Sequence, residues 1–163
     1  MGYTFKIGNA VPKIYEENDY MFLRFEVEPV VSEDAPAFKG DEATGKTNIR
    51  RPSYINWHEF CKETGILDVF FDDRGNLRFG KYGCVMLRKS DHIKVKEALE
   101  LWQKTATIPP GFDDSLTFNE ETQQWYEEGE QKYDYQLARL IWLEWWMGWA
   151  LKNCETPAIE YIV

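Results

Sequence analysis

Eight residues starting at Gly40 have the spacing of a loop that binds phosphate. Residues 40–47 read GDEATGKT, which fits the pattern G-x-x-x-x-G-K-T. In a loop of this kind, backbone amides and the N-terminus of a following helix face the phosphate oxygens, and the lysine adds positive charge. That arrangement needs a buried strand before the loop and a helix after it. Residues 33–36 and 48–52 read EDAP and NIRRP, and Pro52 disfavours a helix that continues from the motif.

These eight residues resemble the phosphate loop of the phosphate-loop NTPases. The resemblance implies a nucleotide held near Lys46, and hence a hydrolase that acts on a nucleotide or a phosphate ester. The rest of the chain lacks the alternating strands and helices of that family, and Asp41 and Glu42 would place negative charge beside the phosphates. Hydrolysis is therefore kept as an alternative function.

A less specific anion site includes the residues that follow this motif. Arginine donates forked hydrogen bonds to phosphate or carboxylate, and a helix that begins behind Ser53 would add free amides. Neighbouring aromatic rings could stack on a base. The alternative is a solvated loop followed by a capped helix. The predicted ligand-binding residues are Lys46, Thr47, Asn48, Arg50, Arg51, Tyr54 and Trp57.

Metal-binding and catalytic signatures are incomplete. His58 and Cys61 have the spacing of half a zinc site, but residue 62 is lysine where a zinc-protease helix carries its second histidine. Adjacent acids such as Asp72 and Asp73 diverge on helices and strands and are typical of solvated turns. We therefore assign no metal, no cofactor and no catalytic residue, although carboxylates distant in sequence can still assemble in space.

The composition favours a single folded domain over residues 1–163. Apolar residues make up 44% of the chain and aromatic residues 16%, which is enough for a hydrophobic core. A net charge of −9 disfavours non-specific binding to nucleic acid or to an anionic membrane. Residues 46–104 carry 12 Lys/Arg against 8 Asp/Glu, a net charge of +4, and this basic middle points to an anionic ligand or to pairing with the acidic ends. Three cysteines at irregular spacing, with no signal peptide or transmembrane run, predict a cytoplasmic protein.

The stretch that should organise the fold is residues 138–151, ARLIWLEWWMGWAL. Its four tryptophans share one helix face, and nearly all of its other positions are apolar. A helix that is apolar nearly all round is buried, and this one is too short to span a bilayer. Alternatively, part of this helix forms a subunit interface, because tryptophan and methionine are enriched at interfaces. The predicted interface residues are Trp142, Trp145, Trp146 and Trp149.

We predict an α+β fold in which an antiparallel sheet, mainly from the N-terminal half, packs against this Trp-rich helix and two shorter helices. Alternating apolar residues predict strands over residues 3–7, 10–15 and 20–31, with a turn at 8–9. Pro12 places the second of these strands at a sheet edge. Residues 32–52 have no apolar periodicity and form a long loop.

After that loop, Ser53 and Gly65 mark the start and the end of a helix. Residues 66–71 read as a short buried strand, and residues 84–87 as another, on either side of a turn at 72–76. An amphipathic helix follows, capped by Ser90 or Asp91.

The C-terminal third is predicted to begin with a linker over residues 105–116. Residues 117–120 read TFNE and match a capping box, which predicts a long helical region over residues 117–153 with a bend near Gly129. Pro157 ends this region, and the apolar tail after it can dock as an additional strand.

Three functions follow from these patterns. The first is a non-catalytic inhibitor or accessory factor that acts through a protein–protein surface, since a small, acidic, aromatic-rich domain suits a phage or bacterial inhibitor. The second is an oligomeric binder of a small anion such as a nucleotide through residues 46–57. The third is the hydrolase described above. The predicted partner is thus another protein or a small anionic ligand, with no membrane, and the balance is against an enzyme.

Overall fold

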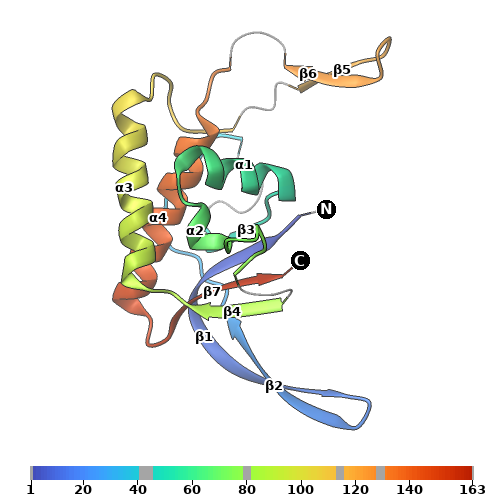
Figure 1. The fold of residues 1–163 in the computed structure, drawn as a ribbon, viewed down its shortest axis with the longest axis vertical. Helices are drawn as coiled ribbons and strands as arrows, with labels where there is room; N and C mark the ends of the chain where they lie inside the picture. Colours follow the sequence, from blue (N-terminus) through green and yellow to red (C-terminus); the bar gives the residue numbers. More distant parts are fainter. Residues whose placement is uncertain (1, 41–45, 79–81, 113–115, 128–130, 163) are drawn as a thin grey trace.

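The chain folds as an α+β protein (Figure 1), known from a computed structural model that describes residues 2–40, 46–78, 82–112, 116–127 and 131–162. The helices are α1 (Tyr54–Thr64), α2 (Leu67–Phe70), α3 (Lys89–Thr105) and α4 (Tyr135–Asn153). The strands are β1 (Thr4–Glu17), β2 (Tyr20–Val27), β3 (Ile49–Arg50), β4 (Tyr82–Met86), β5 (Leu116–Asn119), β6 (Gln124–Glu127) and β7 (Pro157–Ile162).

An antiparallel sheet with the order β2-β1-β7-β4 forms the centre of the fold, and the short β3 pairs with β1 beside β2. The predicted strand at the C-terminus is therefore confirmed, and as β7 it lies between β1 and β4. The helices pack on one side of this sheet (Figure 1), while β5 and β6 form a separate two-stranded hairpin.

One face of the sheet is apolar because alternate residues of its strands point the same way. Phe5 lies opposite Tyr161 and Ile7 lies opposite Ile159, and all four side chains are buried. On the other face Lys6 lies opposite Glu160, and their side chains form an ion pair with Nζ 3.5 Å from Oε2. The helices cover the apolar face, so the core forms between this face and α4.

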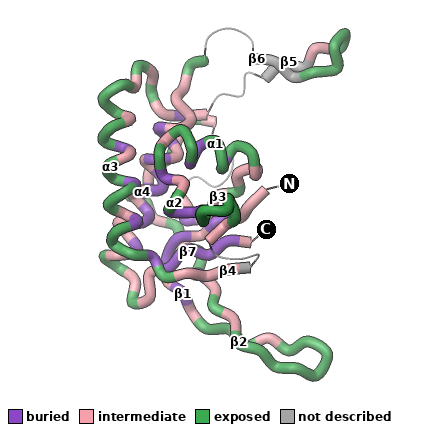
Figure 2. Tube along the Cα trace, in the orientation of Figure 1, coloured by how far each residue is buried: buried purple, intermediate pink, exposed green. Residues whose placement is uncertain are grey.

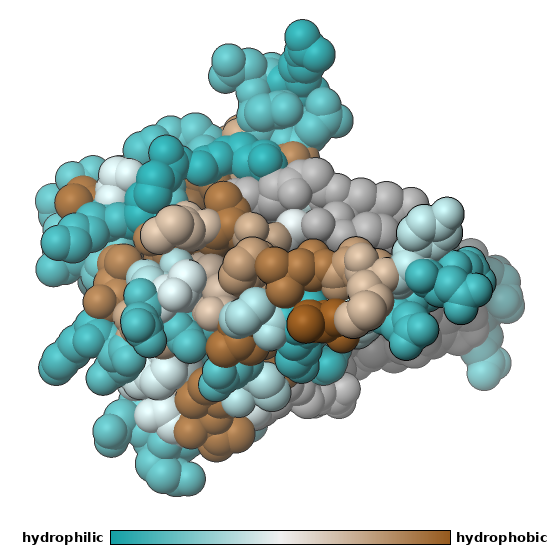
Figure 3. Space-filling view, turned by 90° about the horizontal axis from the view of Figure 1, so that it is seen from below, coloured by the Kyte–Doolittle hydropathy of each residue, from teal (hydrophilic) through white to brown (hydrophobic). Residues whose placement is uncertain are grey.

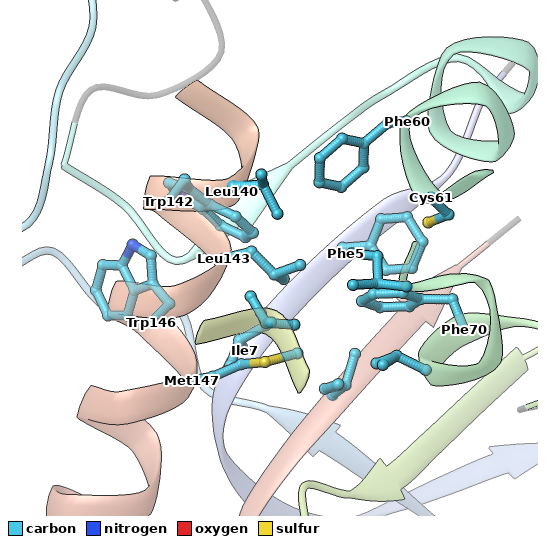
Figure 4. Packing of buried hydrophobic residues seen from close by; sticks show 14 of the residues in the cluster. Phe5, Ile7, Phe60, Cys61, Phe70, Leu140, Trp142, Leu143, Trp146 and Met147 are labelled. Atoms are coloured by element: carbon cyan, nitrogen blue, oxygen red, sulfur yellow. The ribbon is translucent and has the colours of Figure 1, made fainter. Parts of the chain in front are cut away.

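Helix α4 is the buried helix that the Trp-rich stretch predicts. Asp134 caps its N-terminus by accepting a hydrogen bond of 2.9 Å from the Leu137 amide, and Asp134 also accepts one of 2.9 Å from the Trp102 indole. Leu140, Leu143 and Met147 extend from α4 toward the sheet (Figure 4), and all three are fully buried. The amphipathic α3 packs against the outer side of α4.

The predicted caps of α1 are confirmed. The Ser53 hydroxyl accepts a hydrogen bond of 3.2 Å from the Asn56 amide, and Gly65 adopts the left-handed conformation, with φ of 76°, directly after the helix. The buried face of α1 comes from Trp57, Phe60 and Cys61, and the Trp57 ring lies 4.5 Å from that of Phe5. Helix α1 is thereby fixed to β1.

Three predicted elements are wrong. Residues 8–9 do not turn, since β1 runs without a break from Thr4 to Glu17. Residues 66–71 contain the short helix α2 where a strand was expected, because a brief apolar run fits either state. The helix expected over residues 117–153 begins only at Tyr135, and Asn119 caps a turn between β5 and β6 by accepting hydrogen bonds from the Glu121 and Thr122 amides. Gly129, where a bend was expected, lies outside the described residues.

The predicted strand over residues 20–31 alternates as expected, but it ends at Val27 and most of its apolar side chains are exposed. Within the described part of the chain, no helix has the length and apolar character needed to cross a lipid bilayer.

Candidate anion-binding site

A pocket with a volume of about 230 Å³ opens where four segments of the chain meet. These are the end of the long loop, the start of α1, the linker before α4, and the first turns of α4. The lining residues combine three arginines with three aromatic rings and two small polar side chains, and none of the described lining residues is acidic. They are Arg50, Arg51, Pro52, Ser53, Asn56, Trp57, Phe112, Arg139 and Trp142.

Backbone pairing fixes the position of Arg50 and Arg51. Arg50 lies in β3 opposite Phe5 of β1, and the Tyr3 amide donates a hydrogen bond of 2.9 Å to the Pro52 carbonyl. The Arg50 guanidinium lies over the Trp142 ring, 4.9 Å from its centroid. The chain therefore enters α1 along the edge of the sheet, with Arg51 exposed at the mouth of the pocket.

The start of α1 forms one wall of the pocket. Ser53 caps α1 and Asn56 lies in its first turn, where backbone amides point out of the helix and the helix dipole favours a negative charge. Trp57 is 3% exposed, and its indole nitrogen is buried without a hydrogen-bond partner among the described residues. Buried donors of this kind are normally paired.

Arg139 of α4 lies against Phe112 of the linker. Its Cζ is 5.6 Å from the centroid of the Phe112 ring, and its Nη1 donates a hydrogen bond of 2.7 Å to Oε1 of Gln136. Burial lowers the pKa of Arg139 from its usual value, while the charge of Glu63 opposes that shift. A bound anion would compensate this partly desolvated charge.

The long loop and the linker meet at Gly40 and Phe112. The Phe112 amide donates a hydrogen bond of 2.8 Å to the Lys39 carbonyl, and the rings of Phe38 and Phe112 lie 6.4 Å apart, edge to face. Gly40 has a φ of 74°, and a Cβ atom there would lie 2.0 Å from the Phe112 carbonyl oxygen. Glycine is therefore required at this close approach.

Three of the seven predicted ligand-binding residues line this pocket, namely Arg50, Arg51 and Trp57. Lys46 lies on the surface, where its Nζ donates to the Glu33 carbonyl at 2.6 Å and pairs with the Glu33 carboxylate at 3.4 Å. The side chain of Tyr54 packs edge to face on Tyr3, with ring centroids 4.5 Å apart.

Thr47 and Asn48 hold the loop in place from outside the pocket. Thr47 forms a bridge with Val31, and its carbonyl accepts a hydrogen bond of 3.2 Å from the Trp142 indole. The Asn48 side chain is fully buried; it donates to the carbonyls of Ile7 and Glu28 at 3.0 and 2.9 Å and accepts from the Val30 amide at 2.8 Å. The phosphate-loop motif cannot be followed further, because residues 41–45 lie outside the described residues.

The four tryptophans predicted at an interface separate into two groups. Trp142 and Trp146 are buried inside the chain (Figure 4). Trp145 and Trp149 are half-buried and line an open hollow of about 480 Å³ together with Asp34 and Lys152. An interface at this hollow stays a prediction.

Sequence reasoning missed Asn56, Phe112 and Arg139 as pocket residues. Of these three, only Arg139 could have been noticed in the sequence, because a basic residue at the start of the otherwise apolar α4 stretch suggests a charged group near the core. Phe112 belongs to the linker and only reaches the pocket through the fold. No group of three or more His, Cys, Asp and Glu side chains among the described residues could hold a metal ion.

Comparisons with known proteins supply no relative for this chain: no protein-family model, no curated protein and no solved structure matches it.

Proposed function

We propose that the protein binds a small anion that carries a flat ring, such as a mononucleotide, in the pocket between α1 and α4. The observation that supports this proposal is the convergence of Arg50, Arg51 and Arg139 in one pocket whose described lining has no acidic residue. Three guanidinium groups repel one another, and an anion between them would relieve that repulsion while accepting forked hydrogen bonds.

The aromatic lining supports the ring of the ligand. Phe112 is half-buried and can contact a planar ring of the ligand, while Trp57 and Trp142 are buried and form the apolar base of the pocket. The volume of about 230 Å³ is slightly below the range of about 300–1,000 Å³ that is usual for ligand pockets, which favours a small ligand or the charged end of a larger one.

The test is calorimetric titration with adenosine monophosphate, with inorganic phosphate and with uncharged adenosine. We expect the monophosphate to bind more tightly than either fragment, because only the monophosphate uses both the arginines and the rings. Replacing Arg50 and Arg51 with alanine should abolish binding without loss of the fold, whereas Arg74→Ala, at an exposed turn, should change nothing. Equal affinity of the wild type and the double variant would refute the proposal. If the wild type hydrolysed the nucleotide during the titration and the Lys46→Ala variant did not, the hydrolase alternative would be favoured instead.

A non-catalytic inhibitor that acts through a protein–protein surface is the second candidate. The observation that favours it is the open hollow beside Trp145 and Trp149, two rings of the kind that dominate binding energy at interfaces. Replacing Trp149 with alanine should then weaken capture of a single host protein without changing nucleotide binding, and unchanged capture would count against this surface.

We also infer a cytoplasmic location for the protein. Its three cysteines are free thiols, and free thiols are typical of a reducing compartment. Periplasmic or secreted protein in a fractionated native host would contradict this inference.

A further inference from the structure

The outer part of the β1–β2 hairpin projects from the body of the molecule (Figures 1 and 2), and residues 11–26 are here named the arm. The pairing of β1 with β7 ends at Asn9, so beyond this point β1 pairs only with β2. Asn18 and Asp19 close the hairpin with φ of 51° and 66°, as a tight two-residue turn requires. A two-stranded hairpin alone is marginally stable in water, so a binding partner would stabilise the arm.

One face of the arm is apolar. Cross-strand partners point to the same face, which places Ile14 with Leu23 and Pro12 with Phe25, and Met21 continues the row. The exposed fractions are 69% for Ile14, 72% for Met21, 59% for Leu23 and 50% for Phe25. Figure 3 views the molecule from below, the end where the arm projects, and shows hydrophobic side chains there among polar ones. Apolar side chains clustered in this way mark an interaction surface.

The opposite face of the arm is held by contacts within the chain. The Tyr15 hydroxyl donates a hydrogen bond to Glu26, and the Lys13 ammonium pairs with the same carboxylate at 3.1 Å. The Tyr15 ring stacks on Phe22 with centroids 5.7 Å apart. The arm thus keeps its own shape and presents its apolar face and its outer edge.

The outer edge of β2 has backbone groups that point away from β1. The Val27 amide donates to the Glu160 carboxylate at 3.0 Å, so its N–H points away from β1. Backbone direction alternates along a strand, and the N–H and C=O groups of Met21, Leu23 and Phe25 therefore point the same way. No described residue forms a hydrogen bond with these groups. An open hollow of about 210 Å³ lies beside this edge.

The two edges of the arm differ in protection. On the outer edge of β1, Pro12 has no N–H to offer, and a proline of this kind blocks pairing with another strand. The eight residues of β2 contain no proline and only one basic residue, Arg24. The β2 edge is therefore the one that can accept another strand.

We propose that the β2 edge pairs antiparallel with β2 of a second copy of this chain, with Leu23 facing Leu23 on the two-fold axis. This register matches the outward backbone groups, because it sets Met21 opposite Phe25 of the second copy and Leu23 opposite itself. It also places Phe22 opposite Arg24 and Tyr20 opposite Glu26, so that no like charges face each other. The edge is complementary to itself, which is why the occupant is a second copy. This surface lies on the arm and does not depend on the anion pocket.

The first test is the molar mass of the whole protein, measured by light scattering from micromolar to near-millimolar concentration. We expect a dimer for the wild type and a monomer for Leu23→Glu, which sets two carboxylates against each other at the axis. The control is Leu101→Glu, at a leucine of α3 that is 67% exposed, and it should remain dimeric. A monomeric wild type, or a dimeric Leu23→Glu variant, would overturn the proposal.

The second test uses opposite charges at the same position. Leu23→Glu and Leu23→Lys should each be monomeric, with circular dichroism unchanged from the wild type, and an equimolar mixture of the two should form a mixed dimer. Restored mass in the mixture requires residue 23 of one copy to lie next to residue 23 of the other. Two folded monomeric variants that stay monomeric when mixed would overturn the proposed register.

Discussion

The guanidinium of Arg50 lies 4.9 Å above the centre of the Trp142 ring, while the Trp142 indole donates a hydrogen bond of 3.2 Å to the Thr47 carbonyl. One side chain of the central helix therefore fixes both the backbone of the long loop and the charged group that this loop brings to the pocket. A binding residue held in this way loses little freedom when a ligand arrives, which favours affinity.

Replacing Arg139 with methionine should separate binding from stability. The variant removes a partly buried charge but keeps an apolar stem against Phe112, so the free energy of unfolding without ligand should stay the same or rise by about 1 kcal/mol. The affinity for adenosine monophosphate should fall at least about tenfold, as expected for a lost charged hydrogen bond of about 1.5–3 kcal/mol. Urea unfolding and calorimetric titration measure the two quantities. Arg74→Met is the matched control, and a variant that binds normally would remove Arg139 from the site.

Asn48→Ala should be among the most destabilising changes in the long loop. Its amide makes three hydrogen bonds, and truncation would leave the Ile7 and Glu28 carbonyls and the Val30 amide without partners. We expect the free energy of unfolding to fall by about 2–4 kcal/mol. Asn153→Ala, which removes one exposed hydrogen bond to the Trp149 carbonyl, should cost less than about 0.5 kcal/mol. Similar losses in the two variants would show that Asn48 does not hold the loop.

Gly40→Ala and Gly75→Ala form a matched pair. Both glycines have positive φ, 74° and 79°, so alanine costs about 1–2 kcal/mol of backbone energy at either position. At Gly75 the new Cβ meets nothing within 4 Å, whereas at Gly40 it would lie 2.0 Å from the Phe112 carbonyl oxygen. Gly40→Ala should therefore lower the melting temperature further and also weaken anion binding, because Phe112 lines the pocket. Equal effects on melting and on binding would contradict this role.

Alkaline pH should destabilise the protein through the thiols of Cys61 and Cys84 and the hydroxyl of Tyr161. Burial raises the pKa of the Cys61 thiol far above its usual value of 9.0, and raises the pKa of Cys84 to about 11 and that of Tyr161 to about 12. Above about pH 9 for the thiols, and above about pH 10 for Tyr161, the unfolded chain releases protons that the folded chain retains, so stability falls as the pH rises. The loss approaches about 1.4 kcal/mol per pH unit for the buried Cys61 and is smaller for the half-buried Cys84, where solvent screens the charge.

The measurement is the free energy of unfolding in urea at a series of pH values from neutral to about pH 10.5. Cys61→Ala should make the loss of stability with pH shallower, although it removes a packed side chain and lowers stability at neutral pH. Cys154→Ala, at a half-buried thiol, should alter the slope less. A slope that is the same in Cys61→Ala and the wild type would show that Cys61 is not protected from ionisation.

Elements with strong local signals could be predicted from the sequence. Ser53 and Gly65 bound α1 because capping is a short-range property, and the apolar stretch after Arg139 is buried because no solvent-facing stripe interrupts it. The strand predicted over residues 66–71 was wrong because a short apolar run takes the state that its tertiary neighbours impose. The helix predicted from residue 117 was wrong because Asn119, expected within a capping box, instead closes the turn between β5 and β6 by accepting hydrogen bonds from the Glu121 and Thr122 amides.

The pocket could be predicted only in part, because it joins residues that are distant in the chain. Arg50, Arg51 and Trp57 belong to one segment and stood out together as basic and aromatic neighbours. Phe112 and Arg139 reach the same pocket only because the linker packs against the long loop and α4 crosses behind β1. Spacing along the sequence does not show which distant residues come together in the fold. Nor does it ensure that a residue of a motif reaches the site, since Lys46 of the phosphate-loop motif pairs with Glu33 on the surface.

The central position of β7 sets the order in which this fold can be completed. β1 and β4 do not pair with each other in the described sheet but each pairs with β7, which follows α4 in the chain. When β1, β4 and the Trp-rich helix have left the ribosome but β7 has not, the sheet still lacks its middle strand. At that stage Phe5 and Ile7 have no Tyr161 and Ile159 beside them. The sheet can therefore close only after residues 157–162 have been translated. Until then the apolar side chains of β1 stay exposed, and β1 is the strand that chaperones would have to shield for the longest time.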